Sequence, residues 1–214
     1  MSFTVKWKDL RNATYLFHKR DDLARFCNGI DYRNVSSLTS AFEGINKPVI
    51  HSLNNAPMNV SWWEAFAGSK VKMLPKIKGD NYVCSKCSDL MIIDEVVGLE
   101  SSAFNECCPY IIKKLVLKEP ISISDFMDSE IMWYQLLYIR IEGKIKVDAN
   151  VTLVNNSSYH ISIESLVSIF EAFEDNTGEE TQYTVTIGTA QWEKLTEEQR
   201  AIVTSKNIIL AHKN

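Results

Sequence analysis

The amino-acid sequence predicts an α/β fold in which short repeats stack into a solenoid of parallel strands and helical turns, closed by a C-terminal βαβαβ capping unit. Three observations predict this fold. A segment ending in Ala-Phe-x-Gly recurs, short apolar runs follow at similar intervals, and the last third of the chain alternates between strand and helix patterns. Units this short cannot bury their apolar faces alone, so they must stack on one another.

The recurring segment is NVSSLTSAFEG at 34–44 and NVSWWEAFAG at 59–68, with a more distant copy, ESSAFNEC, at 100–107. Each copy predicts one or two turns of helix. Gly44 and Gly68 end the first two copies, at a position where a left-handed backbone conformation costs glycine little.

Short apolar runs typical of strands lie after and between these segments. They are VIHSL (49–53), VKMLP (71–75), LMIID (90–94), IKKLVL (112–117) and LLYIRIE (136–142). With Leu53, Leu74, Ile93, Leu115 and Ile139 as anchors, the intervals are 21, 19, 22 and 24 residues. Leucine-rich repeats are roughly 20–29 residues long, so the spacing predicts a degenerate leucine-rich-repeat-like array.

A helix followed by a strand is predicted in the last third of the chain. One apolar stripe of the helix is formed by Ile163, Leu166, Val167 and Phe170. The run TQYTVTIG then alternates between apolar and polar residues, as a half-buried strand does.

A second helix and a final strand complete the predicted capping unit. Thr196-Glu-Glu-Gln199 is a capping-box pattern, which marks the start of a helix. Asn207 suits a left-handed stop before the strand at 208–210.

Three regions follow from these patterns. We expect an N-terminal cap or attachment segment at 1–30, degenerate repeats at 31–142 and the capping unit at 143–214. A longer helix is predicted at 121–137, within the repeats. No Gly/Ser linker interrupts the chain, so we expect no flexible hinge.

The segments SIESLVSIFEAF, TVTIG and WEKLTEEQRAIVTSKNIILA carry a resemblance to a known family. They are similar to the C-terminal unit of BspA-like leucine-rich-repeat proteins, which are found on bacterial surfaces and in virion proteins of phages of gut bacteria. The steps Cys87-Ser-Asp-Leu and Cys108-Pro-Tyr-Ile, 21 residues apart, resemble the Cys-x-x-Leu step of that family. The chain departs at Asn207-Ile208-Ile209, where the family more often carries Gly-Trp-Thr.

The charge and the N-terminal sequence narrow the possible classes of function. The formal net charge is -4, without a basic cluster, so nucleic acid is not an expected partner. No apolar run approaches the roughly 20 residues that span a bilayer, so membrane insertion is not expected. The N-terminus lacks the features of a signal peptide, and we expect the chain to fold in a cytoplasm.

Four of the five cysteines, Cys84, Cys87, Cys107 and Cys108, suggest two alternatives. Cys-x-x-Cys is a common zinc half-site, and four thiolates can bind zinc. Adjacent cysteines rarely reach one metal, however, and the repeat explains Cys87 and Cys108 as buried core positions. We favour the core interpretation and expect no metal and no cofactor.

An enzyme is not expected. The four histidines are scattered, and no nucleophile elbow, Walker loop or dinucleotide-binding motif occurs. The candidate partner-binding residues are the aromatic pairs Trp62-Trp63 and Trp133-Tyr134. Either both members of a pair pack between repeats, or one contacts a partner, because neighbours on a helix point about 100° apart.

The resemblance and the lack of an export signal together favour a phage virion structural protein, in a tail, baseplate, fibre or capsid decoration. Its partners would be other virion proteins, in multiple copies per particle, and a host surface protein or glycan. The alternatives are a bacterial BspA-like surface adhesin and a small zinc-binding cytoplasmic protein.

Overall fold

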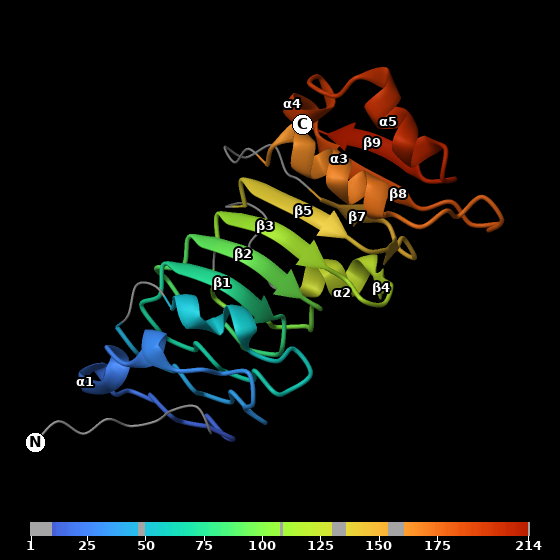
Figure 1. The fold of residues 1–214 in the computed structure, drawn as a ribbon. Helices are drawn as coiled ribbons and strands as arrows, with labels where there is room; N and C mark the ends of the chain where they lie inside the picture. The colour runs from blue at the N-terminus through green and yellow to red at the C-terminus, as the bar shows by residue number, and fades with distance from the viewer. Residues whose placement is uncertain (1–9, 47–49, 108, 130–135, 154–160, 214) are drawn as a thin grey trace, which may run out of the picture.

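The computed structural model describes residues 10–46, 50–107, 109–129, 136–153 and 161–213. Within these ranges the protein is a mixed α/β structure, and every strand pair is parallel. Figure 1 shows an elongated body along which the strands lie side by side, with α1 near one end and β9 near the other. The sequence therefore predicted the class of the fold correctly.

The elements follow one another in a simple order. Strands and helices of the first two thirds are α1 (Asp21–Ala24), β1 (Met73–Lys78), β2 (Ile92–Val97), β3 (Ile111–Val116), β4 (Ile121–Ser122), α2 (Ile123–Asp128) and β5 (Tyr138–Glu142). The last third contains β6 (Ile145–Lys146), β7 (Val151–Thr152), α3 (Ile163–Ala172), β8 (Thr184–Gly188), α4 (Thr189–Trp192), α5 (Glu197–Thr204) and β9 (Ile209–Lys213). The described strands form three sheets, β1-β2-β3-β5, β4-β6 and β7-β8-β9.

The register of the four-stranded sheet aligns one fully buried residue from each strand. These residues are Leu74, Ile93, Ile112 and Ile139. The choice of Leu115 as the anchor of β3 is therefore wrong. Leu115 lies further along the strand than Ile112, and it pairs with Val96 and Ile141. β3 buries two apolar residues and its pairing with β5 shifts between them, which the spacing of the sequence could not reveal.

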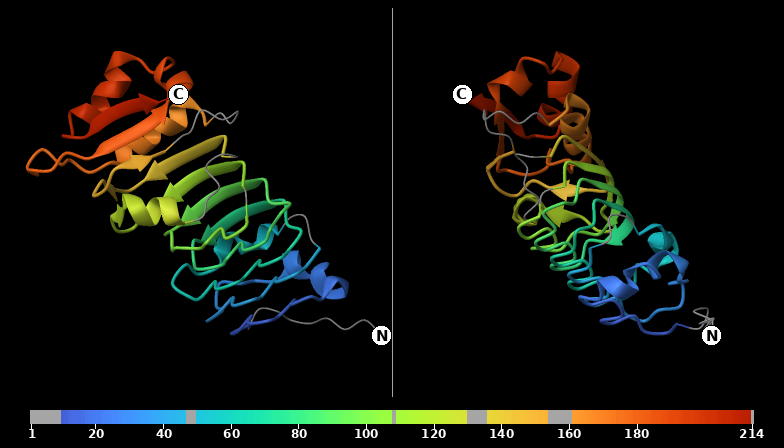
Figure 2. Two further views of the ribbon diagram at one scale, coloured as in Figure 1. Left: turned by 180° about the vertical axis from the view of Figure 1, so that it is seen from behind. Right: turned by 90° about the vertical axis from the view of Figure 1, so that its left-hand side faces the viewer.

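Five turn segments stack into a second ladder, which we call the turn ladder: residues 13–19, 38–44, 62–68, 80–86 and 100–106. Main-chain N–H groups of each segment donate to carbonyl groups of the next. The central bonds run from Phe17 N to Ala41 O (2.8 Å), Phe42 N to Ala65 O (2.8 Å), Phe66 N to Val83 O (2.8 Å) and Cys84 N to Ala103 O (3.1 Å). The views in Figure 2 show these segments stacked in the same order as the strands.

The turn ladder corrects the prediction of helical turns in the recurring segment. Each segment has two left-handed residues, four positions apart, with φ between 48° and 67°. They are Tyr15 and Lys19, Ser40 and Gly44, Glu64 and Gly68, Tyr82 and Lys86, and Ser102 and Glu106. An α-helix needs consecutive right-handed residues, so a left-handed residue every fourth position excludes it.

Aromatic rings from the first three turn segments form the centre of the N-terminal core. The ring of Phe42 stacks on Phe17 and Phe66, with centroid distances of 5.8 and 5.1 Å. Tyr32 meets Phe42 edge-on at 5.7 Å. All four side chains are buried. The phenylalanines at the equivalent position of these three turn segments therefore form one continuous stack of rings.

Two further expectations about secondary structure were wrong. The run at 49–53 is not a strand in its described part, because residues His51–Asn55 form a 3-10 helix. The helix predicted at 121–137 is short: β4 precedes it, α2 ends at Asp128, and residues 130–135 lie outside the described ranges. Ser122 begins α2 by accepting a hydrogen bond from the Asp125 N–H group. The predicted helix is therefore replaced by the short strand β4 and by a helix that begins only after the Ser122 cap.

Helix α3 confirms the predicted apolar stripe and closes one edge of the four-stranded sheet. Leu166 and Phe170 are fully buried. On the same helix, the hydroxyl groups of Ser165 and Ser168 accept hydrogen bonds from the main-chain N–H groups of Ile139 and Ile141 in β5, at 2.9 and 2.8 Å. Side chains of a helix therefore occupy the place of a neighbouring strand.

Replacing Ser165 with alanine should lower the free energy of unfolding by about 1–3 kcal/mol, because the Ile139 N–H group would stay buried without an acceptor. Chemical denaturation followed by circular dichroism measures this change. Ser88→Ala is the control, since Ser88 is exposed and its hydroxyl group donates to the neighbouring carboxylate of Asp89. Equal stability of the two variants would contradict the conclusion that the Ser165 hydroxyl stabilises the edge of β5 as a hydrogen-bond acceptor.

The predicted capping box and the left-handed stop at Asn207 are confirmed. Thr196 and Gln199 form the capping box at the start of α5. Asn207 has φ 58° and its side-chain amide donates to the carbonyl groups of Asn176 and Glu179. Just before it, the Lys206 ammonium group donates to three carbonyl groups at the end of α3, at 2.7–3.0 Å. Through these two side chains, the turn after α5 therefore bonds both to the end of α3 and to the loop that contains Asn176 and Glu179.

Candidate interaction surfaces

One row of exposed apolar side chains crosses the start of the four-stranded sheet. Met91, Tyr110 and Leu137 each immediately precede or begin a strand and are 40–48% exposed. They are neighbours through the main chain, because Tyr110 N donates to Met91 O at 3.0 Å and Leu137 N donates to Tyr110 O at 2.8 Å. We call these three residues the apolar row. Side chains of this kind, held in register by a rigid ladder, are typical of a protein-binding surface.

Further along the same strands, charged side chains pair with one another. The ion pairs are Lys76–Glu95 (2.8 Å), Lys113–Asp94 (2.6 Å) and Lys114–Glu142 (2.8 Å), one at each junction between neighbouring strands. Each pair contributes only about 0.2–1 kcal/mol because it is partly exposed. Their main consequence is that these charges are neutralised within the chain, which favours a partner that also presents an apolar surface.

The structure separates the first predicted aromatic pair. Trp62 is fully buried, packs near Phe66 and donates from Nε1 to the Pro57 carbonyl at 2.9 Å. It is therefore a core residue, and its assignment as a partner-binding residue is corrected. Trp63 is 41% exposed and remains a candidate. The split follows from the tight turn, which directs neighbouring side chains to opposite sides.

Trp63 lies on the turn ladder beside other exposed aromatic side chains and hydroxyl groups. Tyr15 and Tyr82 are 56% and 37% exposed at left-handed positions of their segments. Between Tyr15 and Trp63, a chain of hydroxyl groups links neighbouring segments. It runs from Thr14 to Ser37 (2.9 Å), from Ser37 to Thr39 (3.1 Å) and from Thr39 to Ser61 (3.0 Å). The second predicted pair, Trp133 and Tyr134, lies outside the described residues.

The described cysteines near the predicted zinc half-site are buried core residues. Cys84, Cys87 and Cys107 are fully buried. The Cys87 thiol donates to Phe66 O at 2.8 Å, and the Cys107 thiol donates to Cys87 O at 3.5 Å. The equivalent of Cys87 in the next turn is therefore Cys107 rather than Cys108, which lies outside the described ranges. Within those ranges no group of three or more acidic, histidine or cysteine residues is arranged to hold a metal.

Cys84 should react with iodoacetamide only after the protein unfolds. Burial raises the pKa of its thiol well above the usual value, and the thiolate is the reactive form. Mass spectrometry of peptides labelled in native buffer and in guanidinium measures the difference. A Ser88→Cys variant, with an exposed thiol, gives the reference rate. Native labelling of Cys84 at that rate would contradict the core assignment.

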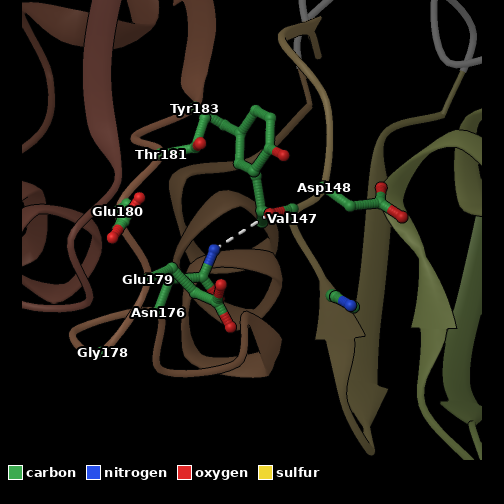
Figure 3. A pocket seen from close by; sticks show the side chains of 9 residues that line it. Val147, Asp148, Asn176, Gly178, Glu179, Glu180, Thr181 and Tyr183 are labelled. Carbon is green, nitrogen blue, oxygen red and sulfur yellow. Dashed lines mark hydrogen bonds between the residues drawn. The ribbon is translucent and has the colours of Figure 1, made fainter.

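A shallow pocket of ≈ 370 Å³ lies in the last third of the chain, between the segment after β6 and the loop before β8 (Figure 3). Asp148, Glu179 and Glu180 contribute carboxylates to it, and all three are exposed. The buried Asn176 amide donates to the Val147 carbonyl at 2.9 Å, so it is used within the fold. The pocket therefore offers no buried charge or amide aimed at a ligand.

The sequence analysis identified Trp63 but missed the apolar row. Met91 and Leu137 lie inside predicted strand runs and Tyr110 lies shortly before one, and the sequence pattern gave no sign that their side chains are exposed. Only the register, which places the three residues side by side, shows that they share a surface.

None of the described helices is long and apolar enough to cross a membrane. Comparisons of the chain with protein-family models, with curated proteins and with solved structures found no match.

Proposed function

We propose that the chain is a leucine-rich-repeat-like solenoid, with a C-terminal capping unit, that serves as a non-enzymatic docking scaffold in a phage virion. The observation that carries this proposal is the apolar row, in which successive turns of one ladder each present an exposed apolar side chain. The three side chains are fixed relative to one another by main-chain hydrogen bonds. Such a row supplies a contact surface without chemistry.

The solenoid interpretation is supported by the two ladders. Leu74, Ile93 and Ile112 align at intervals of 19 residues, and Ile139 follows after a longer insertion. The turn ladder runs beside them with its own recurring phenylalanine. The turn segments 62–68, 80–86 and 100–106 are each followed by one strand, β1, β2 and β3, as in a leucine-rich repeat.

The virion assignment rests on the resemblance to BspA-like proteins. Mass spectrometry of gradient-purified particles, from the virus whose genome encodes the chain, tests it. We expect the chain in the particles at a fixed ratio to the capsid protein. Confinement of the chain to the soluble lysate would overturn the assignment.

The docking role of the apolar row is tested by changing its side chains together. A Met91→Ser, Tyr110→Ser, Leu137→Ser variant should bind its docking partner about thirtyfold more weakly and be incorporated into particles correspondingly less, because losing an interface hot spot costs about 2 kcal/mol or more. Tyr82→Ser is the matched control, since it removes an exposed aromatic side chain from the turn ladder instead. Normal incorporation of a folded triple variant would exclude the apolar row as the docking surface, and a selective defect of Tyr82→Ser would point to the turn ladder.

A further inference from the structure

The outer edge of β9 carries main-chain groups that the described part of the chain leaves without partners. β9 pairs with β8 in parallel, with Thr184 opposite Ile209 and Thr186 opposite Ala211. In a parallel pair alternate residues direct both N–H and C=O toward the neighbour, and Ile209 N donates to Tyr183 O at 2.9 Å. Ile209, Ala211 and Lys213 therefore bond to β8, while Leu210 and His212 direct their main-chain groups outward.

This open edge differs from the edge of β5, which Ser165 and Ser168 close with hydroxyl acceptors. Soluble proteins usually protect an edge strand with charged side chains such as lysine, with proline, with a bulge or with a covering element, and β9 has a lysine only at its last residue, Lys213. β9 has the sequence ILAHK, without proline, and its register with β8 is continuous from Ile209 to Lys213. The first residue of β9, Ile209, is apolar and is 44% exposed. A second strand can therefore add to this edge.

We propose that β9 pairs antiparallel with β9 of a second copy of this chain, about a two-fold axis through Ala211. In this register Leu210 lies opposite His212 of the second copy, and His212 lies opposite its Leu210. Each pair is of the hydrogen-bonded type, so the four outward N–H and C=O groups of each copy are all satisfied. Ala211 lies opposite Ala211 in the closer, non-hydrogen-bonded position, where a small side chain fits.

The side chains are compatible with this register. Ile209 lies opposite Lys213 of the second copy, so no like charges face each other directly. The His212 ring is held by its own chain, with its centroid 4.7 Å from that of Trp192 and Nδ1 3.2 Å from the Thr189 hydroxyl. It therefore stays clear of the edge while its main chain bonds to the second copy.

The symmetry explains why the partner is a second copy in antiparallel orientation. A two-fold contact uses both open edges at once and closes the assembly as a dimer. Addition of β9 to a different edge of the next copy would leave an open edge at each end and produce a filament. This pairing does not depend on the proposed virion role.

A cysteine at position 211 provides a register-specific test. Non-hydrogen-bonded antiparallel partners have Cα atoms about 4.5 Å apart, which lies within the range for disulfides of roughly 4.4–6.8 Å. The Ala211→Cys variant, incubated with oxidised glutathione, should form a covalent dimer on non-reducing gels. Lys213→Cys is the control, because position 213 lies opposite position 209 and has no thiol to meet. Equal crosslinking of both variants, or none for Ala211→Cys, would overturn the proposed register.

A second pair of variants tests the main-chain contact itself. His212→Pro removes an outward N–H group but none that bonds to β8, and should convert the dimer to a monomer in analytical ultracentrifugation. His212→Ala loses the same ring contacts and keeps the N–H group, so it should remain a dimer. Circular dichroism establishes that both variants are folded, and hydrogen exchange of the Leu210 and His212 amides reports the contact independently. A monomeric parent protein whose two amides exchange freely at high concentration would refute the pairing.

Discussion

Replacing Gly79 with alanine should lower the free energy of unfolding by about 3 kcal/mol, at the upper end of the cost of overpacking. A Cβ atom at this position would lie 2.3 Å from the carbonyl oxygen of Gly98 and 3.1 Å from Cα of Leu99. Both are main-chain atoms of the next turn, so no side chain can move aside. The bond from Gly79 N to Val97 O, at 3.0 Å, would have to lengthen as the two turns separate.

The expected change in melting temperature is about 6–12 °C for a chain of this size. Differential scanning calorimetry measures it. Gly29→Ala is the matched control, because a Cβ atom there meets nothing within 4 Å and the residue lies in a short 3-10 helix. A Gly79→Ala protein as stable as Gly29→Ala would show that the turns at β1 and β2 are more widely spaced than the structure has them.

Truncating Phe66 to alanine should cost about 3–5 kcal/mol, the usual range for removing a buried aromatic ring. Its ring stacks on Phe42 at 5.1 Å with an interplanar angle of 8°, and is tilted against Trp62 at 6.4 Å. The cavity would lie at the end of the stack, in a turn segment that main-chain hydrogen bonds hold between its two neighbouring segments, so the neighbours cannot collapse into it. Urea denaturation measures this loss in the free energy of unfolding. We expect the m value, the slope of that free energy against urea concentration, to stay unchanged.

Phe26→Ala is the control for this prediction. The Phe26 side chain is 42% exposed, and its ring carries one contact with the Arg25 guanidinium, 4.8 Å from the ring centroid. Its loss should cost no more than about 0.5–1 kcal/mol. Similar losses for the two variants would mean that the phenylalanine stack does not organise the N-terminal core.

The patterns that the sequence predicted well are local and long. The apolar stripe of α3 spans two turns of helix, and the capping box and Asn207 define α5 at both of its ends. The predicted alternation of β8 holds too, with Val185 and Ile187 buried. In each case neighbouring residues are sufficient to specify the element, because the side chains involved lie within one or two turns of one another.

The failures involve contacts between turns of the chain. The recurring Ala-Phe segment was predicted to be helical, but its left-handed residues include Ser40, Glu64 and Ser102, residue types that rarely adopt that conformation. The main-chain ladder holds them there, at a cost of about 1–2 kcal/mol per residue. The choice of Ile112 over Leu115 as an anchor likewise depends on pairing with β2, which lies outside any local window.

The candidate surfaces likewise differ in whether they depend on neighbouring residues or on contacts between turns of the chain. Trp63 was named as one member of a tryptophan pair, but the sequence decided neither which member is buried nor whether either contacts a partner. The apolar row could not be identified, because Met91, Tyr110 and Leu137 become neighbours only when the register is known. The outward main-chain groups of β9 carry no side-chain signal at all, so no property of the ILAHK sequence alone distinguishes an outer strand from an inner one.

The direction of the hydrogen bonds has a mechanical consequence. In both the sheet and the turn ladder these bonds run from one turn to the next, along the long dimension of the body in Figure 1. A pull on the two extremities would load them one after another, and the molecule would peel open at low force.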